Sequence, residues 1–555
     1  MTQITGGDVI ARTLASAGVK AIFALHGAHV DTIFQAAAQN DIRLIDMRHE
    51  AAVGHAAEGY ARVTRGLGVA VVTAGPGFTN CLSSMANAFT DGTPVLYIAG
   101  APDLSEAQSN GLQSGVDPAA MATPVTKWAH QITRPEDIAR LVAHAVRVAT
   151  TAPTGPVFLS VPTDVIGAMI ADGGQSVSSP IVDSPAWPAP NLVEAARELL
   201  ASAERPVILV GREAWYANAG GALRVFAETT GIPVFSDFAA HGLIPADHPL
   251  YGGTGHKLAY VGADRPDLVL ALGVKFGLFT LGDGAMLFPA DAKVIHVTVD
   301  GAELGKVRRA DVAVAADARA MLEMLNAAPP AMNRAAVDAW AATVRAAVPA
   351  RHALLNAEAD GHNGPIHPWP AVKAVAAAAA DHILVADGAE AYHWLNEALA
   401  QKQAGSYLTH GHFGCMGIGL GLAVGAQVAA PTRRVMLLTG DGAFGFTIAE
   451  LDTLARHDLP VVVVVTNNHS WGASQRFQDG GPPERRVVAT TLGDARYDRV
   501  AAGFGCDGVR VTDLVALAPA LDAAFASGRP TVIDVRVDYA PPAPELALMV
   551  SGRRH

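Results

Sequence analysis

The chain has 555 residues, of which 50% are hydrophobic and 17% charged, and its formal net charge is -12. This composition excludes a disordered, collagen-like or small disulfide-rich protein, and the length predicts three or four domains of about 150 residues. The 40 Lys and Arg residues form no basic cluster along the chain, so nucleic acid is not an expected partner.

Sequence signals for export and membrane insertion are lacking. Cys81, Cys415 and Cys506 are far apart and odd in number, which favours a reducing compartment over a disulfide or zinc framework. The N-terminal residues lack the basic start and apolar core of a signal peptide. The longest aliphatic runs are far shorter than the roughly 20 residues needed to cross a bilayer. We therefore expect a soluble cytoplasmic protein with no membrane partner.

Two breaks in composition divide the chain. Residues 172–191 are rich in Gly, Ser and Pro and predict a surface linker, and residues 327–370 form a second break with one short helix near 335–347. The predicted domains are residues 1–172, 190–328 and 362–555.

Short apolar strands alternate with Ala-rich helical stretches in all three segments. In chain order the expected strands are Val69–Thr73, Val95–Ala99, Val157–Val161, Val207–Val210, Leu268–Leu272, Val294–Val299, Ile383–Ala386, Val435–Thr439, Val461–Thr466 and Thr531–Val535. Apolar strands separated by helices are typical of parallel sheets with crossover helices. The predicted fold class is α/β, with three doubly wound parallel-sheet domains.

The first segment places polar side chains at turns that follow apolar stretches. His29 comes after the Gly27 turn, at the edge where an open parallel sheet binds ligands. His49-Glu50 could suggest a zinc motif, but that motif needs a second His at position 53, which is Val. A metalloprotease is therefore excluded.

The third segment contains the most specific motif. The strand ending at Thr439 leads into Gly440-Asp441-Gly442, a helix is expected from about Thr447 to His457, and the next strand ends in Asn467-Asn468. One βαβ unit can make these strands neighbours, which brings Asp441 and Asn468 together. Their oxygens and a nearby backbone carbonyl are the ligands that Mg²⁺ bridging a diphosphate requires.

This GDG-x24-NN pattern resembles the diphosphate motif of thiamin-diphosphate enzymes of the acetohydroxyacid synthase and decarboxylase type. Two stretches of the first segment, 48–62 and 73–80, are similar to the family's Glu-bearing helix and pyrimidine-side turn. Residues 25–35, 123–130 and 467–473 resemble the benzaldehyde lyases within that superfamily. The likeness spans essentially the whole chain.

The resemblance implies a role for each motif residue. Glu50 would hydrogen-bond the aminopyrimidine and activate the cofactor, and Met416 would wedge between its two rings while Gly414 accepts from the 4'-amino group. The metal ligands would be Asp441, Asn468 and Ser470. The full set of implied cofactor-binding residues is Glu50, Thr73, Gly388, Ala389, Gly414, Met416, Asp441, Gly442, Ala443, Asn468, Ser470, Trp471 and Gly472.

Substrate handling is assigned to two residues of the first segment. A neutral imidazole at His29 suits proton removal, and the Gln113 amide can orient substrate oxygens without titrating; His26 and His410 are alternatives. Ala28 cannot hydrogen-bond a carboxylate, which favours aldehyde and 2-hydroxy ketone substrates. The expected pocket consists of Leu25, Ala28, His29, Gln113, Tyr392, Trp471 and Ala473. Thr163 departs from a Trp in the benzaldehyde lyase pattern.

The expected function is a thiamin-diphosphate- and Mg²⁺-dependent lyase and carboligase that reversibly cleaves (R)-2-hydroxy ketones of the benzoin type into aldehydes. A 2-oxo acid decarboxylase or acetohydroxyacid synthase-like enzyme is one alternative, and a non-catalytic cofactor-binding subunit is another. The middle segment has no clean G-x-G-x-x-G after a strand, so we expect it to be structural. The family further implies a homodimer at least, and commonly a homotetramer, with active sites between chains.

Overall fold

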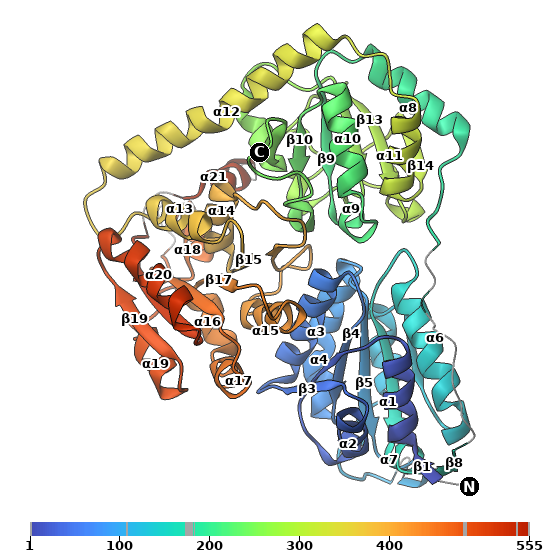
Figure 1. Cartoon of the computed structure of the whole chain (residues 1–555). Helices are drawn as coiled ribbons and strands as arrows, with labels where there is room; N and C mark the ends of the chain where they lie inside the picture. The colour runs from blue at the N-terminus through green and yellow to red at the C-terminus, as the bar shows by residue number, and fades with distance from the viewer. Residues whose placement is uncertain are drawn as a thin grey trace.

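The computed structural model has three α/β units, each with a six-stranded parallel sheet, and this confirms the predicted fold class (Figure 1). It describes residues 3–106, 109–172, 181, 184–480, 486–539 and 542–552. The sheets lie within residues 21–162, 206–315 and 383–536. Most of the expected linker 172–191 is outside the described residues. None of the helices in the described ranges is both long enough and apolar enough for a bilayer crossing.

The N-terminal unit has the strand order β3-β2-β4-β5-β7-β6. A two-stranded antiparallel sheet, β1 with β8, joins the start of the unit to its end. The strands are β1 (Gln3–Thr5), β2 (Ala21–Ala24), β3 (Arg43–Asp46), β4 (Gly68–Val72), β5 (Val95–Ala101), β6 (Trp128–Gln131), β7 (Val157–Pro162) and β8 (Met169–Ala171). The helices are α1 (Gly6–Ser16), α2 (Asp31–Gln39), α3 (Glu50–Thr64), α4 (Pro76–Thr90), α5 (Pro118–Ala122), α6 (Ile138–Thr150) and α7 (Thr163–Ile166).

The central unit repeats this architecture with the strand order β11-β10-β9-β12-β13-β14. Its strands are β9 (Pro206–Val210), β10 (Val234–Ser236), β11 (Tyr251–Thr254), β12 (Leu268–Leu272), β13 (Lys293–Thr298) and β14 (Val312–Ala315). Its helices are α8 (Pro190–Ser202), α9 (Arg212–Tyr216), α10 (Gly220–Thr230) and α11 (Ala318–Ala327).

The C-terminal unit has the order β16-β15-β17-β18-β20-β19, so β17 and β18 are neighbours as the motif predicted. The strands are β15 (Ile383–Asp387), β16 (Tyr407–Leu408), β17 (Val435–Gly440), β18 (Val462–Asn467), β19 (Asp507–Val511) and β20 (Thr531–Arg536). The helices are α13 (Pro368–Ala378), α14 (Ala389–Ala398), α15 (Gly419–Ala429), α16 (Asp441–Thr447), α17 (Glu450–Arg456), α18 (Gly472–Asp479), α19 (Tyr497–Gly503), α20 (Leu517–Ser527) and α21 (Pro544–Gly552).

Two helices differ from the sequence-based expectation. The helix expected from Thr447 to His457 is in fact two, because α16 begins at Asp441, directly after the strand, and a turn at Ile448-Ala449 separates it from α17. The short helix expected near 335–347 is α12 (Arg334–Asp360), which continues through Pro349. Figure 1 shows α12 running along the outside of the molecule from the central to the C-terminal unit.

The N-terminal and C-terminal units share a core where α3 packs on α15. Glycine makes this approach possible, because a Cβ atom at Gly425 would lie 1.9 Å from the carbonyl oxygen of Ala56, and one at Gly59 would lie 2.4 Å from that of Leu422. At the same junction, buried Arg62 of α3 donates to the Thr409 carbonyl of the C-terminal unit at 2.7 Å, and it pairs with Asp91 of its own unit at 2.9 Å. These contacts fix α3, whose first residue is Glu50, against the unit that carries the GDG motif.

Candidate active site

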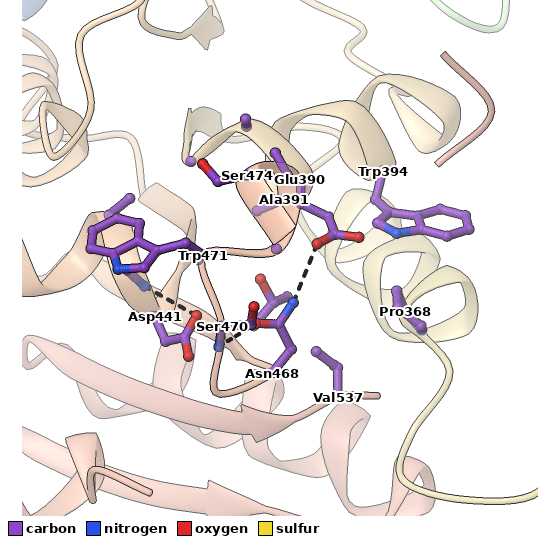
Figure 2. A pocket seen from close by; sticks show the side chains of 18 of the residues that line it. Pro368, Glu390, Ala391, Trp394, Asp441, Asn468, Ser470, Trp471, Ser474 and Val537 are labelled. Carbon is purple, nitrogen blue, oxygen red and sulfur yellow. Dashed lines mark hydrogen bonds between the residues drawn. The ribbon is translucent and has the colours of Figure 1, made fainter. Parts of the chain in front are cut away.

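A cavity lies at the carboxyl edge of the C-terminal sheet, where β15, β17 and β18 end (Figure 2). It contains about 790 Å³ of empty space. Its lining combines the two glycine turns, the Asn468 loop and the start of α18: Pro368, Val372, Gly388, Ala389, Glu390, Ala391, Trp394, Met416, Gly440, Asp441, Gly442, Ala443, Thr466, Asn468, Ser470, Trp471, Gly472, Ala473, Ser474 and Val537. The edge that the sequence motif singled out is therefore hollow.

Asp441 is the only carboxylate of the predicted metal site. Its Oδ1 accepts a hydrogen bond from the Gly442 amide at 3.0 Å, whereas its buried Oδ2 has no hydrogen-bond partner among the described residues. Burial raises the pKa of Asp441 to about 6, although neighbouring backbone amides act in the opposite direction. A buried carboxylate oxygen without a donor is a suitable ligand for a divalent cation.

The other two predicted metal ligands are in the loop after β18. The Asn468 amide nitrogen donates to Glu390 at 3.3 Å, and its Oδ1 accepts from the Ser470 amide at 3.1 Å. The Ser470 hydroxyl donates to Gln475 and Thr490, so the backbone carbonyl is the oxygen that Ser470 would offer a metal. Asn467 instead contacts Asp534 within the sheet, at 2.9 Å. Carboxylate, amide and carbonyl oxygens together fit Mg²⁺.

Two helix N-termini and a glycine turn face the cavity. Gly388 has φ +85°, and a Cβ atom there would lie 3.1 Å from the Gly440 amide nitrogen. It precedes α14, and α16 begins at Asp441. The first backbone N–H groups of a helix lack intrahelical partners and attract anions. This cradle fits a diphosphate group.

Asp387 is a buried residue of this site to which sequence reasoning assigned no role. It is buried at the end of β15 and accepts hydrogen bonds from the amides of Gly388 at 2.7 Å, Gly417 at 3.2 Å and Gly419 at 2.8 Å. The carboxylate therefore joins the Gly388 turn to the turn that carries Met416. Gly414, in the same turn as Met416, adopts φ +74°, which is a conformation that favours glycine.

Glu50 is the first residue of α3, and His49 caps that helix by accepting from the Ala51 amide at 3.1 Å. The Asn80 side chain donates to Glu50 Oε2 at 2.9 Å. Oε1 lies beside Gly77, where an added Cβ atom would be 3.7 Å away. Asn80 thus holds one carboxylate oxygen and leaves the other for a ligand, a role that sequence reasoning had not assigned.

His29 and Gln113 flank the carboxyl edge of the N-terminal sheet. His29 lies in a short 3-10 turn, residues 28–30, and its Nδ1 is 3.1 Å from the Thr73 hydroxyl. Gln113 has φ +61° and packs against Gly75, and its Oε1 is buried without a hydrogen-bond partner among the described residues. Thr73, predicted to contact cofactor, therefore supports His29, and Gln113 retains an unused acceptor.

The remaining pocket candidates have different surroundings. Trp471 and Ala473 line the cavity, whereas Ala28 is exposed beside His29 and Leu25 packs on the shared core. The alternatives to His29 are engaged elsewhere. His26 Nε2 is 3.2 Å from Asp31, and buried His410 contacts the Gly411 carbonyl at 2.8 Å.

Tyr392 and Thr163 contribute to local packing in this chain. Tyr392 is buried, with its ring 6.2 Å from that of Phe279 and 4.9 Å from that of His410, and it does not line the cavity. The Thr163 hydroxyl donates to Asp103, which pairs the ends of two neighbouring strands. The role of Tyr392 in the substrate pocket stays a prediction.

Within the described ranges, the cavity is lined by residues of the C-terminal unit. All its lining residues lie between 368 and 537, and Glu50, His29 and Gln113 are not among them. The two sets of predicted residues therefore form separate half-sites in one chain.

A second cavity, of about 1170 Å³, lies between the N-terminal and central units. Its lining carries both acidic and basic side chains, including Lys127, Arg212, Asp300 and Glu303. The expectation that the central unit is structural stays a prediction.

Glu450 is a second acidic residue that sequence reasoning missed. It is fully buried and accepts from the Arg48 amide at 3.1 Å and from the Thr453 hydroxyl at 2.6 Å, so it holds the loop that leads to Glu50. Burial raises its pKa from 4.5 to about 7, which disfavours the charged form in the folded protein. This part of the folding free energy is therefore fully present below about pH 4.5 and is lost as the pH rises through about 7.

We expect Glu450→Gln to remove that pH dependence. Relative to the parent, the ligand-free variant should gain about 3 kcal/mol in free energy of unfolding between pH 4.5 and pH 8. Urea unfolding across this range measures the difference, with exposed Glu228→Gln as the control. A difference between parent and Glu450→Gln that is constant with pH would contradict the expectation.

Comparisons with known proteins cover all three units. Residues 4–121, 193–325 and 387–535 match the N-terminal TPP binding domain, central domain and C-terminal TPP binding domain of thiamine pyrophosphate enzymes. A probable acetolactate synthase of Mycobacterium bovis is 34% identical over 539 residues, covering 96% of this chain and 95% of that protein. A probable acetolactate synthase large subunit of Methanocaldococcus jannaschii is 30% identical, with 99% and 94% coverage. Acetolactate synthase isozyme 2 large subunit of Escherichia coli is 29% identical, with 96% coverage of both chains.

Proposed function

The chain belongs to the thiamine pyrophosphate enzymes of the acetohydroxyacid synthase and decarboxylase type, and from that premise we propose that it forms 2-hydroxy ketones with thiamin diphosphate and Mg²⁺. The proposed donor is a 2-oxo acid, which loses CO2 as its acyl carbon is joined to the carbonyl carbon of a second molecule. The names of relatives that match along nearly the whole chain support this donor. Of the three functions inferred from the sequence, this one was the first alternative.

One observation carries the cofactor part of the proposal. Among the described residues, none donates a hydrogen bond to buried Asp441 Oδ2, which lies in the same cavity as Asn468, at the edge where two helix N-termini meet a glycine turn. Asp441, Asn468 and the Ser470 carbonyl would hold the metal, and the backbone amides near Gly388 and Gly442 would hold the diphosphate. Bound thiamin diphosphate supplies a nucleophilic carbon for addition to carbonyl groups.

The side chains of the N-terminal unit would handle protons. Glu50 would exchange a proton with the aminopyrimidine through the oxygen that Asn80 leaves unbound. His29, which Thr73 orients through Nδ1, would move a proton at the substrate hydroxyl with its Nε2. The unused Oε1 of Gln113 would accept a hydrogen bond from the same substrate.

A second candidate function is the reversible cleavage of benzoin-type 2-hydroxy ketones into aldehydes, in which the donor is an aldehyde. The residues around His29 support it. Ala28 offers no side-chain hydrogen bond, and the predicted pocket residues Leu25, Ala28, His29 and Gln113 include no Lys or Arg that could pair with a carboxylate. A neutral substrate would leave no charge unpaired there.

One set of assays tests both candidates. Purified protein with thiamin diphosphate and Mg²⁺ is incubated with pyruvate, benzoylformate, benzaldehyde or benzoin. CO2 release with formation of a 2-hydroxy ketone from a 2-oxo acid supports the first candidate. Release of benzaldehyde from benzoin, with no CO2 released from pyruvate or benzoylformate, supports the second candidate. Failure to transform any substrate, with cofactor bound, favours the non-catalytic subunit.

Replacing Ala28 by Ser should move the enzyme toward 2-oxo acids. An added hydroxyl can donate to a carboxylate, and a hydrogen bond to a charged group contributes about 1.5–3 kcal/mol, so the ratio of decarboxylation to 2-hydroxy ketone cleavage should rise about tenfold. Product analysis on pyruvate and benzoin measures this ratio. Ala28→Gly is the control without a hydroxyl, and an unchanged ratio in Ala28→Ser would contradict our view of the pocket.

We further propose that two chains complete each active site, in at least a homodimer and as a homotetramer built from two dimers. The separation of the half-sites within one chain supports this assembly. Mixing a Glu50→Gln chain with an Asp441→Asn chain tests it, because about half of the dimers would then be mixed and would each contain one intact shared site. Activity should recover to about a quarter of the parent value. No recovered activity would favour sites within single chains.

A further inference from the structure

Glu390 is an acidic side chain inside a cavity that fits an anionic cofactor. It belongs to the first turn of α14 and lies almost buried beside Asn468 (Figure 2). An isolated buried carboxylate at a diphosphate site is unfavourable, because it loses hydration and repels the ligand. The neighbouring side chains explain how it is tolerated.

Arg476 of α18 neutralises Glu390 through one carboxylate oxygen. Its Nε donates to Oε1 at 2.6 Å and its Nη2 donates to the same oxygen. Arg476 is itself fixed, since it donates to the Tyr539 carbonyl at 3.1 Å and its guanidinium lies 4.3 Å from the centre of the Tyr539 ring. Burial raises the pKa of Glu390, and Arg476 is the strongest opposing influence.

The second oxygen of Glu390 faces the Asn468 amide. Asn468 Nδ2 donates to Oε2 at 3.3 Å, and Figure 2 shows the amide oxygen turned the other way, toward Ser470. A Cβ atom at position 472 would lie 1.8 Å from Oε2, so Gly472 is needed for α18 to approach this pair. The two carboxylate oxygens thus have separate partners.

An amide side chain has two orientations of nearly equal shape, which exchange the nitrogen and the oxygen. Only one of them gives a hydrogen bond to Glu390, because the other would set the amide oxygen against the carboxylate. In the favoured orientation Oδ1 accepts from the Ser470 amide and keeps a second lone pair for a cation. Second-sphere partners of this kind commonly fix metal ligands.

We propose that Glu390, held by Arg476, is a positioning residue that keeps the Asn468 amide oxygen directed at the metal. This inference rests on the metal site proposed above. It concerns a contact outside the set of metal ligands. The alternative is that the Glu390–Arg476 pair only holds α14 and α18 together, and that role would not change metal affinity.

Glu390→Gln tests the inference with Mn²⁺ as the probe, in the presence of thiamin diphosphate. Electron paramagnetic resonance of free Mn²⁺ gives the affinity without any turnover. Loss of a second-sphere partner typically lowers metal affinity 10–100-fold, and we expect a loss of that size. Glu390→Asp, which keeps the charge but withdraws it from Asn468, should lose affinity in the same direction. Glu194→Gln removes a surface pairing with Arg197 and should change nothing.

Exchanging the donor and the acceptor between positions 390 and 468 distinguishes the positioning role from a purely structural link between α14 and α18. In Asn468→Asp two carboxylates would face each other, whereas in the double variant Glu390→Gln/Asn468→Asp the Gln amide can donate to the new carboxylate. The double variant should bind Mn²⁺ at least about tenfold more tightly than Asn468→Asp. Near-ultraviolet circular dichroism checks the fold of each variant.

The outcomes distinguish this inference from the metal site itself. Unchanged Mn²⁺ affinity in folded Glu390→Gln and Glu390→Asp, with loss in Asp441→Asn, would overturn the positioning role and leave the metal site standing. Absence of rescue in the double variant would also overturn it. Unchanged affinity in Asp441→Asn would refute the proposed metal site first.

Discussion

Glu50→Gln should lower the rate of C2 hydrogen exchange of bound thiamin diphosphate by about 10²–10⁴-fold, the usual contribution of a positioned proton-transfer group. Gln has nearly the same shape and can still accept from Asn80, but it cannot exchange a proton with the aminopyrimidine. Proton nuclear magnetic resonance after acid quenching measures the exchange directly. Because the assay needs no substrate, it is independent of the choice between 2-oxo acids and aldehydes.

Two control variants test whether the loss of exchange is specific to the Glu50 carboxylate. Exposed Glu136→Gln, in the same unit, should exchange at the parent rate, and Asn80→Ala should fall between the parent and Glu50→Gln, because it loosens Glu50 but keeps its carboxylate. Cofactor affinity must remain measurable in each variant. If the parent exchanged no faster than free cofactor, the chain would be a non-catalytic binding subunit; if Glu50→Gln matched a fast parent, Glu50 would not be the activator.

The sequence predicts the parts of this site that are contiguous in the chain. Asp441 and Asn468 could be placed together because they terminate consecutive strands, and parallel neighbours end at the same edge. Strand cores such as β12 were predicted to the residue, since strands buried on both faces are continuous apolar runs. The start of α16 was placed six residues too late, because glycines mask the helical pattern there.

Residues whose partners are distant in the sequence were not predicted. Asn80 contacts Glu50 from 30 positions away, and Glu450 holds the amide of Arg48 across 402 positions. Neither has a local pattern that differs from an ordinary helix residue. Asp387 is adjacent to a recognised turn, yet its partners at Gly417 and Gly419 become visible only when β15 and α15 meet. Only the pairing of segments identifies such residues.

Contacts between distant segments also determine which residues form the predicted substrate pocket. Leu25, Ala28 and His29 are close in sequence, and the structure keeps them at one sheet edge. Tyr392, which was grouped with them, packs on Phe279 and His410, and its place in the substrate pocket stays a prediction. A tyrosine in the first turns of a helix after a strand has the same local sequence whether it faces a ligand or the core. Burial by other segments decides between them.

Asp441→Asn should weaken Mg²⁺ binding more than about 100-fold, because it removes the one carboxylate of the proposed ligand set, whereas second-sphere losses alone cost 10–100-fold. Thiamin diphosphate affinity should fall with it, since the metal offsets the charge of the diphosphate. Calorimetric titration of Mg²⁺ at saturating cofactor measures the first effect. Exposed Asp381→Asn, in the same unit, is the matched control and should bind as the parent does.

Stability should change in the opposite direction. Buried Asp441 Oδ2 has no donor in the part of the chain that the structure describes, and an uncompensated buried charge is destabilising. Asp441→Asn should therefore unfold in urea no earlier than the parent when metal and cofactor are removed. With saturating Mg²⁺ and cofactor the order should reverse, because a ligand that binds only the folded state stabilises it. A variant that is less stable than the parent without ligands would mean that Asp441 serves the fold and not the metal.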